Sequence, residues 1–287
     1  MVTIDRQRAT VLDGLSFGEG PRWHDGALYL ADMHRHQVLR VDKAGTAETI
    51  AQHASAVSGI GWLPDGTLLV VAMEGEVLRL GPAGLSLHAD LRGEAAHGVN
   101  DMIVHPGGWA YVGQFGYDRE SGARPVPSPL LRVDTDGTVA AAAQHLLVAN
   151  GMIISPDGQT LLVAESAGCR ITAFTVGPAG QLRDRRVWAQ LPAPHYPDGI
   201  CLDADGGVWV ACPMAGRFVR TVEGGDITDE IPAGPERHAV ACVLGGPDRH
   251  TLYLLTAATL GDAERSLALG SARVERVSVT VPGAGLP

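Results

Sequence analysis

The chain has 287 residues, a formal net charge of −10 and 45% apolar residues. This length suits one large all-β or α/β domain or two ordinary ones, and the apolar share is enough for a sizeable core. Nucleic acids and anionic membranes both bind basic protein surfaces. We therefore expect neither as a partner of such an acidic chain.

The N-terminal stretch reads "MVTIDRQRATVLDG" and lacks the continuous apolar segment of a signal peptide. Nowhere does the sequence approach the roughly 18 consecutive apolar residues that a membrane span needs. The four cysteines lie singly in apolar segments without Cys-x-x-Cys spacing. We expect them to be reduced and buried rather than metal ligands, and we expect a cytoplasmic protein.

A turn followed by a short strand recurs along the whole chain. Each copy places Asp-Gly or a close equivalent before a run rich in Val, Leu, Tyr or Trp. In chain order the copies are "HDGALYLADM", "PDGTLLVVAM", "PGGWAYVGQF", "PDGQTLLVAES", "ADGGVWVACP" and "PDRHTLYLLTA". A second strand follows most of them, as in "HQVLRVD", "GEVLRLG", "PLLRVDTDG", "CRITAFTV" and "GRFVRTV".

Units of about 40 to 50 residues with several short strands are typical of propeller blades. Six copies predict an all-β fold, a six-bladed β-propeller, with residues 1–287 as a single domain. The C-terminal "ARVERVSVTVP" alternates like a strand, and we expect it to pair with N-terminal strands and close the ring. A β-sandwich is the alternative, but its strands would recur every 8 to 12 residues or so without a longer unit.

One polar residue precedes the apolar strand in each unit. In "ANGMIISPDG" the turn comes at Ser155 to Gly158, so the Asn150–Gly151 pair is not the hairpin turn, and Asn150 is predicted to begin an inner strand. The matching positions are Glu19, Ser58, Asn100, Asn150, Asp198 and His238. Inner strands line a propeller's central channel, so we expect Glu19, Asn100, Asn150 and Asp198 to meet there, with His238 as a further candidate.

The chemistry of this predicted ring favours a cation. Glu19 and Asp198 supply carboxylates, which would repel one another, and Asn100 and Asn150 supply amide oxygens. An all-oxygen set suits Ca²⁺, Mg²⁺ or Mn²⁺ better than zinc. We expect one divalent cation, calcium first, with magnesium, manganese or zinc as alternatives. The competing interpretation is that these residues cap local turns.

Four stretches closely resemble the senescence-marker-protein/gluconolactonase/luciferin-regenerating-enzyme family: "GEGPRW", "VND", "ANGMIISPDGQTLLVAES" and "YPDGICLDADGGVWVA". The resemblance covers essentially the whole chain and implies a six-bladed propeller that hydrolyses lactones with one divalent metal in its channel. It places the metal ligands on Glu19, Asn150 and Asp198, a substrate-binding residue on Asn100, and the general base on Asp198.

One departure from the family concerns the substrate. Sugar-lactone members carry an Arg two residues before this Asn, whereas "HGVND" has Gly98 there. Loss of a side chain with several donors weakens the case for a polyhydroxylated sugar lactone, and cyclic esters of other kinds stay open.

Three neighbours of the ring are further substrate-binding candidates. His97 and Asp101 flank Asn100 closely, and His195 precedes Asp198 in "HYPDG". Histidines here could line the pocket mouth and move protons, although exposed loop histidines are the common alternative.

The predicted function is a metal-dependent hydrolase of lactones or related cyclic esters, in which Asp198 deprotonates a metal-activated water. Its partner is a small-molecule lactone or ester, and we expect a monomer or small homo-oligomer. A non-catalytic propeller that binds a ligand or partner around a structural metal is the alternative. Organophosphate hydrolysis and a condensation like that of strictosidine synthase are further alternatives.

Overall fold

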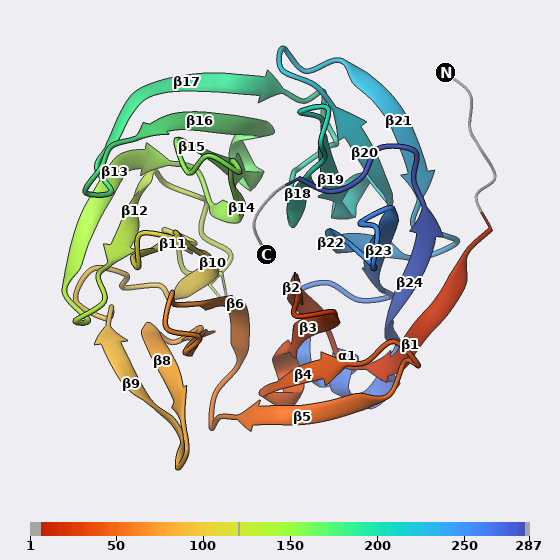
Figure 1. The fold of residues 1–287 in the computed structure, drawn as a ribbon, viewed down its shortest axis with the longest axis horizontal. Helices are drawn as coiled ribbons and strands as arrows, with labels where there is room; N and C mark the ends of the chain where they lie inside the picture. The colour runs from red at the N-terminus through yellow and green to blue at the C-terminus, as the bar shows by residue number, and fades with distance from the viewer. Residues whose placement is uncertain (1–6, 120, 285–287) are drawn as a thin grey trace.

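The computed structural model describes residues 7–119 and 121–284. Within them, 24 strands form six four-stranded antiparallel sheets that stand around a common axis (Figure 1). The prediction of an all-β, six-bladed β-propeller is therefore confirmed. The first six and last three residues of the predicted 1–287 domain lie outside the described residues.

Five blades are continuous in sequence and run from the innermost to the outermost strand. Blade 1 contains β2 (Gly18–His24), β3 (Ala27–Asp32), β4 (Gln37–Val41) and β5 (Ala47–Gln52), and blade 2 contains β6 (Val57–Trp62), β7 (Leu68–Ala72), β8 (Glu76–Gly81) and β9 (Gly84–Asp90). Blade 3 contains β10 (Val99–Val104), β11 (Ala110–Gln114), β12 (Ser128–Val133) and β13 (Val139–Leu146). Blade 4 contains β14 (Ala149–Ile154), β15 (Thr160–Glu165), β16 (Arg170–Val176) and β17 (Leu182–Gln190). Blade 5 contains β18 (Ile200–Leu202), β19 (Val208–Cys212), β20 (Arg217–Thr221) and β21 (Ile227–Pro232).

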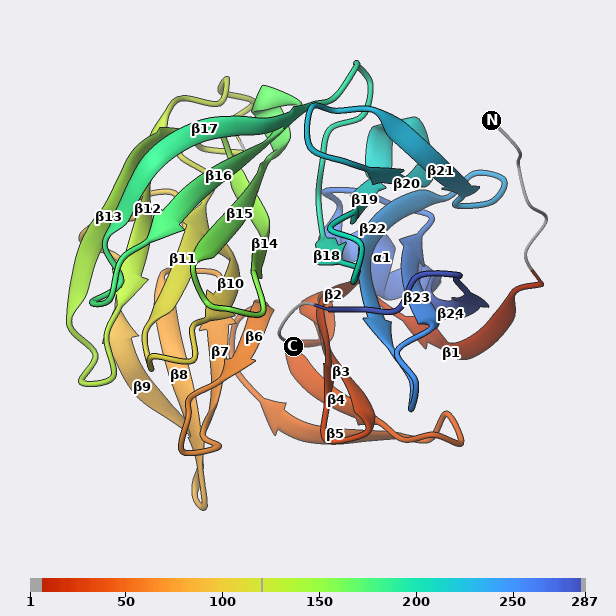
Figure 2. The same ribbon diagram turned by 45° about the horizontal axis from the view of Figure 1, so that its top comes forward.

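Blade 6 joins the two ends of the chain. Its inner strands are β22 (His238–Gly245), β23 (Thr251–Ala257) and β24 (Ala272–Ser278), and its outermost strand is β1 (Ala9–Leu15). The antiparallel pairing of β1 with β24 places Ala9 opposite Arg276 and Leu15 opposite Ala272. Figure 2 shows β1 along the outer side of β24. β24 is therefore paired on both sides, and β1 completes the fourth strand of the blade where the ring closes.

Burial follows the position of a strand within its blade. Every residue of β7 and of β19 is buried, because neighbouring blades cover both faces of these strands. Outer strands such as β9 are mostly exposed or half-buried, with Ala89 as the one buried residue of β9, and carry more polar residues. The cysteines are all free, and Cys201 and Cys242 lie with their sulfurs 3.8 Å apart between blades 5 and 6.

Helical structure is confined to short connections. Three 3₁₀ turns follow second strands: η1 (Met33–Arg35), η2 (Ser166–Gly168) and η3 (Pro213–Ala215). The helix α1 (Ala263–Leu269) begins where the Asp262 side chain accepts a hydrogen bond from the Arg265 N–H at 2.9 Å. No helix in the described part of the chain is long and apolar enough to cross a bilayer.

Candidate functional site

The ring residues of blades 2, 3 and 4 lie at β-bulges. In blade 3, Val99 faces Gln114 but Met102 faces Val112, so the inner strand has one extra residue around Asn100. The same irregularity surrounds Ser58 in β6 and Asn150 in β14. A bulge turns a side chain out of the regular alternation of a strand. These inner strands can therefore direct a polar side chain toward the channel while their following residues stay in the core.

Glycines beside the ring residues allow the inner strands to approach closely. A Cβ added to Gly151 would lie 2.5 Å from the Asp198 carbonyl oxygen, and one added to Gly59 would lie 2.3 Å from the Met102 nitrogen. The Gly151 N–H donates to the Asp198 carbonyl at 3.2 Å. The Asn150–Gly151 pair is therefore a contact between blades 4 and 5, and no larger residue fits there without a backbone shift.

Hydrogen bonds fix the orientation of the Asn150 amide. The Ser166 hydroxyl donates to the Pro197 carbonyl at 2.6 Å, so it accepts the hydrogen bond from Asn150 Nδ2 at 3.2 Å. The amide nitrogen thus faces Ser166, and the amide oxygen is left as an acceptor or ligand.

Asn100 is oriented in the same way. It is 6% exposed, and its Nδ2 donates to the Ala149 carbonyl at 3.4 Å. The Ser58 hydroxyl donates to the Asn100 main-chain carbonyl at 2.5 Å, so Ser58 holds the neighbouring strand. The side-chain oxygen of Asn100 is not used in either bond.

The carboxylates of Glu19 and Asp198 are close enough to affect each other. Asp198 Oδ1 is buried and has no hydrogen-bond partner among the described residues. Burial first, and then the charge of Asp101, raise the pKa of Asp198, although a hydrogen bond from Asn150 opposes the shift. Burial raises the pKa of Glu19 well above its usual value, and the charges of Asp198 and Asp101 add to that increase. Two carboxylates with this little compensation favour protons or a cation.

The Asp101 carboxylate has more hydrogen-bond partners than the carboxylates of Glu19 and Asp198. Its Oδ1 accepts from the Met102 N–H at 2.7 Å and lies 3.3 Å from Arg22 Nη2. Burial raises the pKa of Asp101, while the Arg22 guanidinium acts in the opposite direction. Sequence reasoning missed Arg22, whose only signal was an arginine on a predicted inner strand.

The histidines are placed less uniformly. His97 is exposed, and His195 is half-buried with its Nδ1 2.8 Å from the Pro192 carbonyl oxygen. His238 is the first residue of β22 and faces Ala257, so Ala239 occupies the position equivalent to Glu19. Aligning blade 6 by its turn therefore placed His238 one residue out of register. The bulge between Ala239 and Ala241 belongs to a longer inner strand than those of the other blades.

The donor set fits a hard divalent cation. Among residues 7–119 and 121–284, no three His, Cys, Asp or Glu side chains gather as a metal cluster. The candidate set instead combines the Glu19 and Asp198 carboxylates with the Asn150 amide oxygen. The unpartnered Asp198 Oδ1 and the raised pKa values of both acids are what an oxygen-binding cation such as Ca²⁺, Mg²⁺ or Mn²⁺ would relieve.

The fold places the chain among the six-bladed β-propellers. Within that class, residues 17–258 match the model of the family described as SMP-30/Gluconolactonase/LRE-like region. The chain belongs to this family, as the sequence resemblance predicted.

Named relatives match most of the chain. Pentonolactonase XacC of Haloferax volcanii is 28% identical over 255 residues, which cover 85% of this chain and 83% of the relative. The 6-deoxy-6-sulfogluconolactonase of Pseudomonas putida is 26% identical over 277 residues and 94% of both chains. The crystal structure of a calcium-binding protein, regucalcin, from Agrobacterium tumefaciens superposes with a TM-score of 0.82 at 20% identity. That superposition covers 100% of this chain and 99% of the other, and at this identity it supports the fold alone.

Proposed function

We propose that this protein is a divalent-metal-dependent hydrolase of lactones or related cyclic esters. The observation that carries the proposal is the pair of close carboxylates, Glu19 and Asp198, with the Asp198 Oδ1 atom buried and unpartnered. The lactonases among the relatives support the reaction class. Calcium is the first candidate cation, because the proposed ligands are all oxygen atoms of carboxylates and an amide.

Each side chain has one proposed role. Glu19, Asn150 and Asp198 would hold the cation, whose charge polarises an ester carbonyl and acidifies water. Asp198 accepts the proton of the attacking water, and Asn100 orients the carbonyl or a neighbouring hydroxyl of the substrate. Ser166 keeps the amide oxygen of Asn150 directed away from its own hydroxyl, through the bonds at 3.2 and 2.6 Å.

Residues around the ring bear on substrate choice. Gly98 has a φ of +83°, and a Cβ there would lie 2.5 Å from the Met73 carbonyl oxygen. An arginine cannot replace it without moving the backbone, so this chain has no room for a sugar-binding guanidinium at position 98. We therefore propose that lactones with few hydroxyl groups and other cyclic esters are substrates alongside sugar lactones. Asp101, His97 and His195 remain proposed substrate contacts.

Substrate size, location, oligomeric state and alternative metals complete the proposed function. We propose a small-molecule substrate, a cytoplasmic location and a monomer or small homo-oligomer, with Mg²⁺, Mn²⁺ or Zn²⁺ as alternatives to Ca²⁺.

Chelation tests the proposed function. Purified protein is treated with a chelator and assayed against sugar lactones, unsubstituted lactones and aryl esters, with each divalent cation added back in turn. We expect hydrolysis to stop on chelation and to return with one or more cations. Hydrolysis that survives complete metal removal would exclude the metal mechanism, and no turnover with any cation or substrate would favour a ligand-binding propeller.

A further inference from the structure

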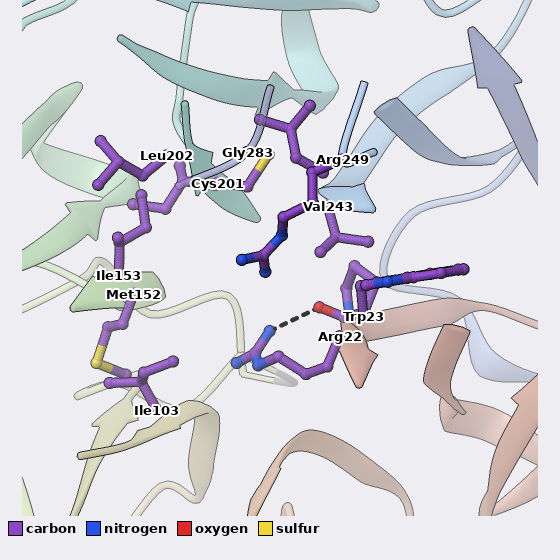
Figure 3. Close-up of a pocket in the computed structure, with 13 residues that line it drawn as sticks. Arg22, Trp23, Ile103, Met152, Ile153, Cys201, Leu202, Val243, Arg249 and Gly283 are labelled. Carbon is purple, nitrogen blue, oxygen red and sulfur yellow. Dashed lines mark hydrogen bonds between the residues drawn. The ribbon is translucent and has the colours of Figure 1, made fainter. Parts of the chain in front are cut away.

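The end of the channel beyond Arg22 leaves little room for a substrate. A small cavity there is lined by residues that include Arg22, Ile103 and Ile153, each three residues after a ring position (Figure 3). Its volume is about 30 Å³, which holds one or two water molecules and is too small for a lactone. Glu19 and Asp198 are half-buried, so solvent reaches the ring. A substrate therefore has to enter from the other end, where the inner strands begin.

The second strands end at the level where the inner strands begin. In blade 1, the Met33 N–H donates to the Phe17 carbonyl at 2.8 Å, directly beyond the first residue pair of β2 and β3. In blade 2, the Met73 N–H donates to the Ala56 carbonyl at 2.9 Å in the same way. Phe17 and Ala56 each lie two positions before a ring residue, about 6 to 7 Å along the strand. Side chains at this level are therefore the first that a substrate meets on its way to the ring.

Apolar side chains from four neighbouring blades gather at this level. Three of them, Met33, Met73 and Phe115, directly follow the last residue of a second strand. All belong to one apolar cluster, which also extends into the core between blades 1 and 6. Each is between 6% and 8% exposed, so each keeps a small accessible part. We refer to these five residues as the collar: Phe17, Met33, Met73, Phe115 and Val148.

Blades 5 and 6 are less apolar at the corresponding level. Tyr196 lies two positions before Asp198 and is 38% exposed. Arg237 has the corresponding place in blade 6, and its guanidinium donates to Thr256 Oγ1 at 2.8 Å and to the Ser271 carbonyl at 2.8 Å. The Arg237 charge is therefore bonded within its own blade. The entrance to the ring has an apolar side at blades 1 to 4 and a more polar side at blades 5 and 6.

Val148 of the collar has an unusual backbone conformation. Its φ is +57°, in the left-handed region that β-branched residues rarely adopt. Its carbonyl accepts from the Ser166 N–H at 3.0 Å, and the Ser166 hydroxyl accepts from Asn150. Glycine or asparagine would adopt this conformation at a lower cost in free energy. Uncommon conformations of this kind cluster at functional sites, and an apolar contact with a ligand accounts for a valine here.

Met73 lies directly beside the strand that carries Asn100. A Cβ on Gly98 would lie 2.5 Å from the Met73 carbonyl oxygen, and the Val99 N–H donates to the same oxygen at 3.0 Å. Asn100 is the proposed contact of the substrate carbonyl or of a neighbouring hydroxyl. A substituent on a lactone ring held at Asn100 would therefore reach the collar, and burial of its apolar surface there would stabilise the complex.

We propose that the collar binds an apolar substituent of the substrate, so that the preferred substrates are lactones with an alkyl or aryl side chain. This inference rests on the proposed lactone hydrolysis. The collar offers no strong hydrogen-bond partner to the hydroxyl groups of a sugar, which would lose water there without replacement. A polyhydroxylated lactone is therefore the poorer substrate.

Lactones of one ring size with alkyl chains of increasing length test the collar. In the wild type, kcat/KM should rise by up to about fourfold for each added methylene, the factor expected for burial of one CH₂ group. Met73→Gln keeps a similar shape but has a polar end, so the ratio of kcat/KM between the longest and the unsubstituted lactone should fall about tenfold or more. The control Leu87→Gln, on the outer strand β9 and 55% exposed at this position, should keep the wild-type ratio. Turnover that does not depend on chain length in the wild type would overturn the proposal.

Val148→Asn is a second variant that does not depend on the folding of Met73→Gln. Asparagine has a volume close to that of valine and adopts the left-handed conformation more readily, so it suits the backbone at this position. The preference for long alkyl chains should weaken as in Met73→Gln. A wild-type ratio in whichever of the two variants folds would contradict the role of the collar.

Binding of alkyl-substituted lactams, which resist hydrolysis, separates this inference from the proposed function. Calorimetric titration of the wild type should give a Kd that falls by up to about fourfold per methylene, and this dependence should weaken in Val148→Asn. Lactam binding with this dependence but without turnover of any lactone would contradict the proposed hydrolysis and support the collar. A Kd that does not change with chain length, or no lactam binding at all, would overturn the collar even if lactones are hydrolysed.

Discussion

Glu165 and Asp198 are carboxylates of adjacent blades with opposite environments: Glu165 is fully buried, whereas Asp198 is half-buried with its Oδ1 atom inaccessible to solvent. Glu165 is 0% exposed and accepts hydrogen bonds from Arg170 at 2.8 and 3.0 Å, from Arg185 at 3.1 Å and from the Leu147 N–H at 2.9 Å. Burial alone would raise its pKa, but the hydrogen bonds from Arg170 and Thr172 more than offset this, and the pKa of Glu165 falls.

Asp198 lacks this compensation. Within the described part of the chain its Oδ1 has no hydrogen-bond partner, and burial together with the Asp101 charge raises its pKa. A carboxylate surrounded by donors stabilises the folded protein, whereas one left beside other carboxylates is available to a proton or a cation. Burial alone therefore does not distinguish a structural acid from a functional one; the hydrogen-bond donors around the carboxylate do.

The largest effect is expected for Asp198→Asn. Asparagine keeps a side-chain oxygen but cannot accept the proton of water, so kcat at saturating metal should fall by about 10² to 10⁴. The measurement is steady-state lactone hydrolysis with metal binding monitored separately. Asp157→Asn, in a turn on the surface, is the matched control and should keep wild-type kcat. Wild-type kcat in Asp198→Asn with metal bound would make Asp101 or His195 the better candidate base.

Glu165→Gln should act on stability instead of catalysis. It leaves Arg170 and Arg185 without their buried carboxylate, and the free energy of unfolding should drop by on the order of 3 kcal/mol. Urea denaturation measures the change, with the exposed Glu223→Gln as control, expected within about 0.5 kcal/mol of wild type. If Glu165→Gln had the same free energy of unfolding as the control, the stabilising role of the Glu165 carboxylate would be wrong.

Glu19→Gln should weaken metal binding before it affects turnover. The variant loses one anionic oxygen but keeps Asp198, so the metal Kd should rise about tenfold or more, equivalent to about 1.4 kcal/mol. The activity of Glu19→Gln should then recover at high metal concentration, whereas the activity of Asp198→Asn should not. Calorimetric titration together with kcat at saturating metal distinguishes the two variants. An unchanged metal Kd would remove Glu19 from the ligand set.

A further effect concerns the pH dependence of stability in the presence of a chelator. The folded pKa values of Glu19 and Asp198 lie above those of an unfolded chain, so between the two values the native state binds more protons. The stability that these two groups contribute is fully present below about pH 4 and is lost as pH rises through the folded pKa. The free energy of unfolding falls by at most about 1.4 kcal/mol per pH unit for each group. Urea denaturation from pH 5 to 8 should show Asp198→Asn losing less stability than the wild type. Parallel curves would contradict the raised pKa of Asp198.

The repeat of turns and strands was enough to predict the propeller, because each blade reuses one local pattern of Asp-Gly turn and apolar strand. The same periodicity selected Glu19, Asn100, Asn150 and Asp198 as equivalent positions, and their joint role as a site stays a prediction. Counting from turns failed in blade 6, because β22 is longer than the other inner strands and Ala239, not His238, takes the equivalent place.

The sequence pattern could not predict contacts between distant segments of the chain. Nothing near Glu165 in the chain indicates Arg185, 20 residues away, as its partner. Likewise, Arg22 meets Asp101 and Met102 across 79 and 80 residues, and only the folded ring brings them together. The exposure of His97 depends on its loop in the same way. Local pattern predicts which residues begin the inner strands, while the donors around each acid come from the tertiary structure.

Diffraction from crystals loaded with Mn²⁺ tests most directly whether the uncompensated carboxylates form a cation site. We expect one anomalous peak in the channel, about 2.0 to 2.6 Å from oxygens of Glu19, Asn150 and Asp198. The peak should weaken or vanish in Glu19→Gln crystals and persist in Glu223→Gln crystals. A channel without a peak at saturating Mn²⁺, or manganese bound only on the surface, would contradict it.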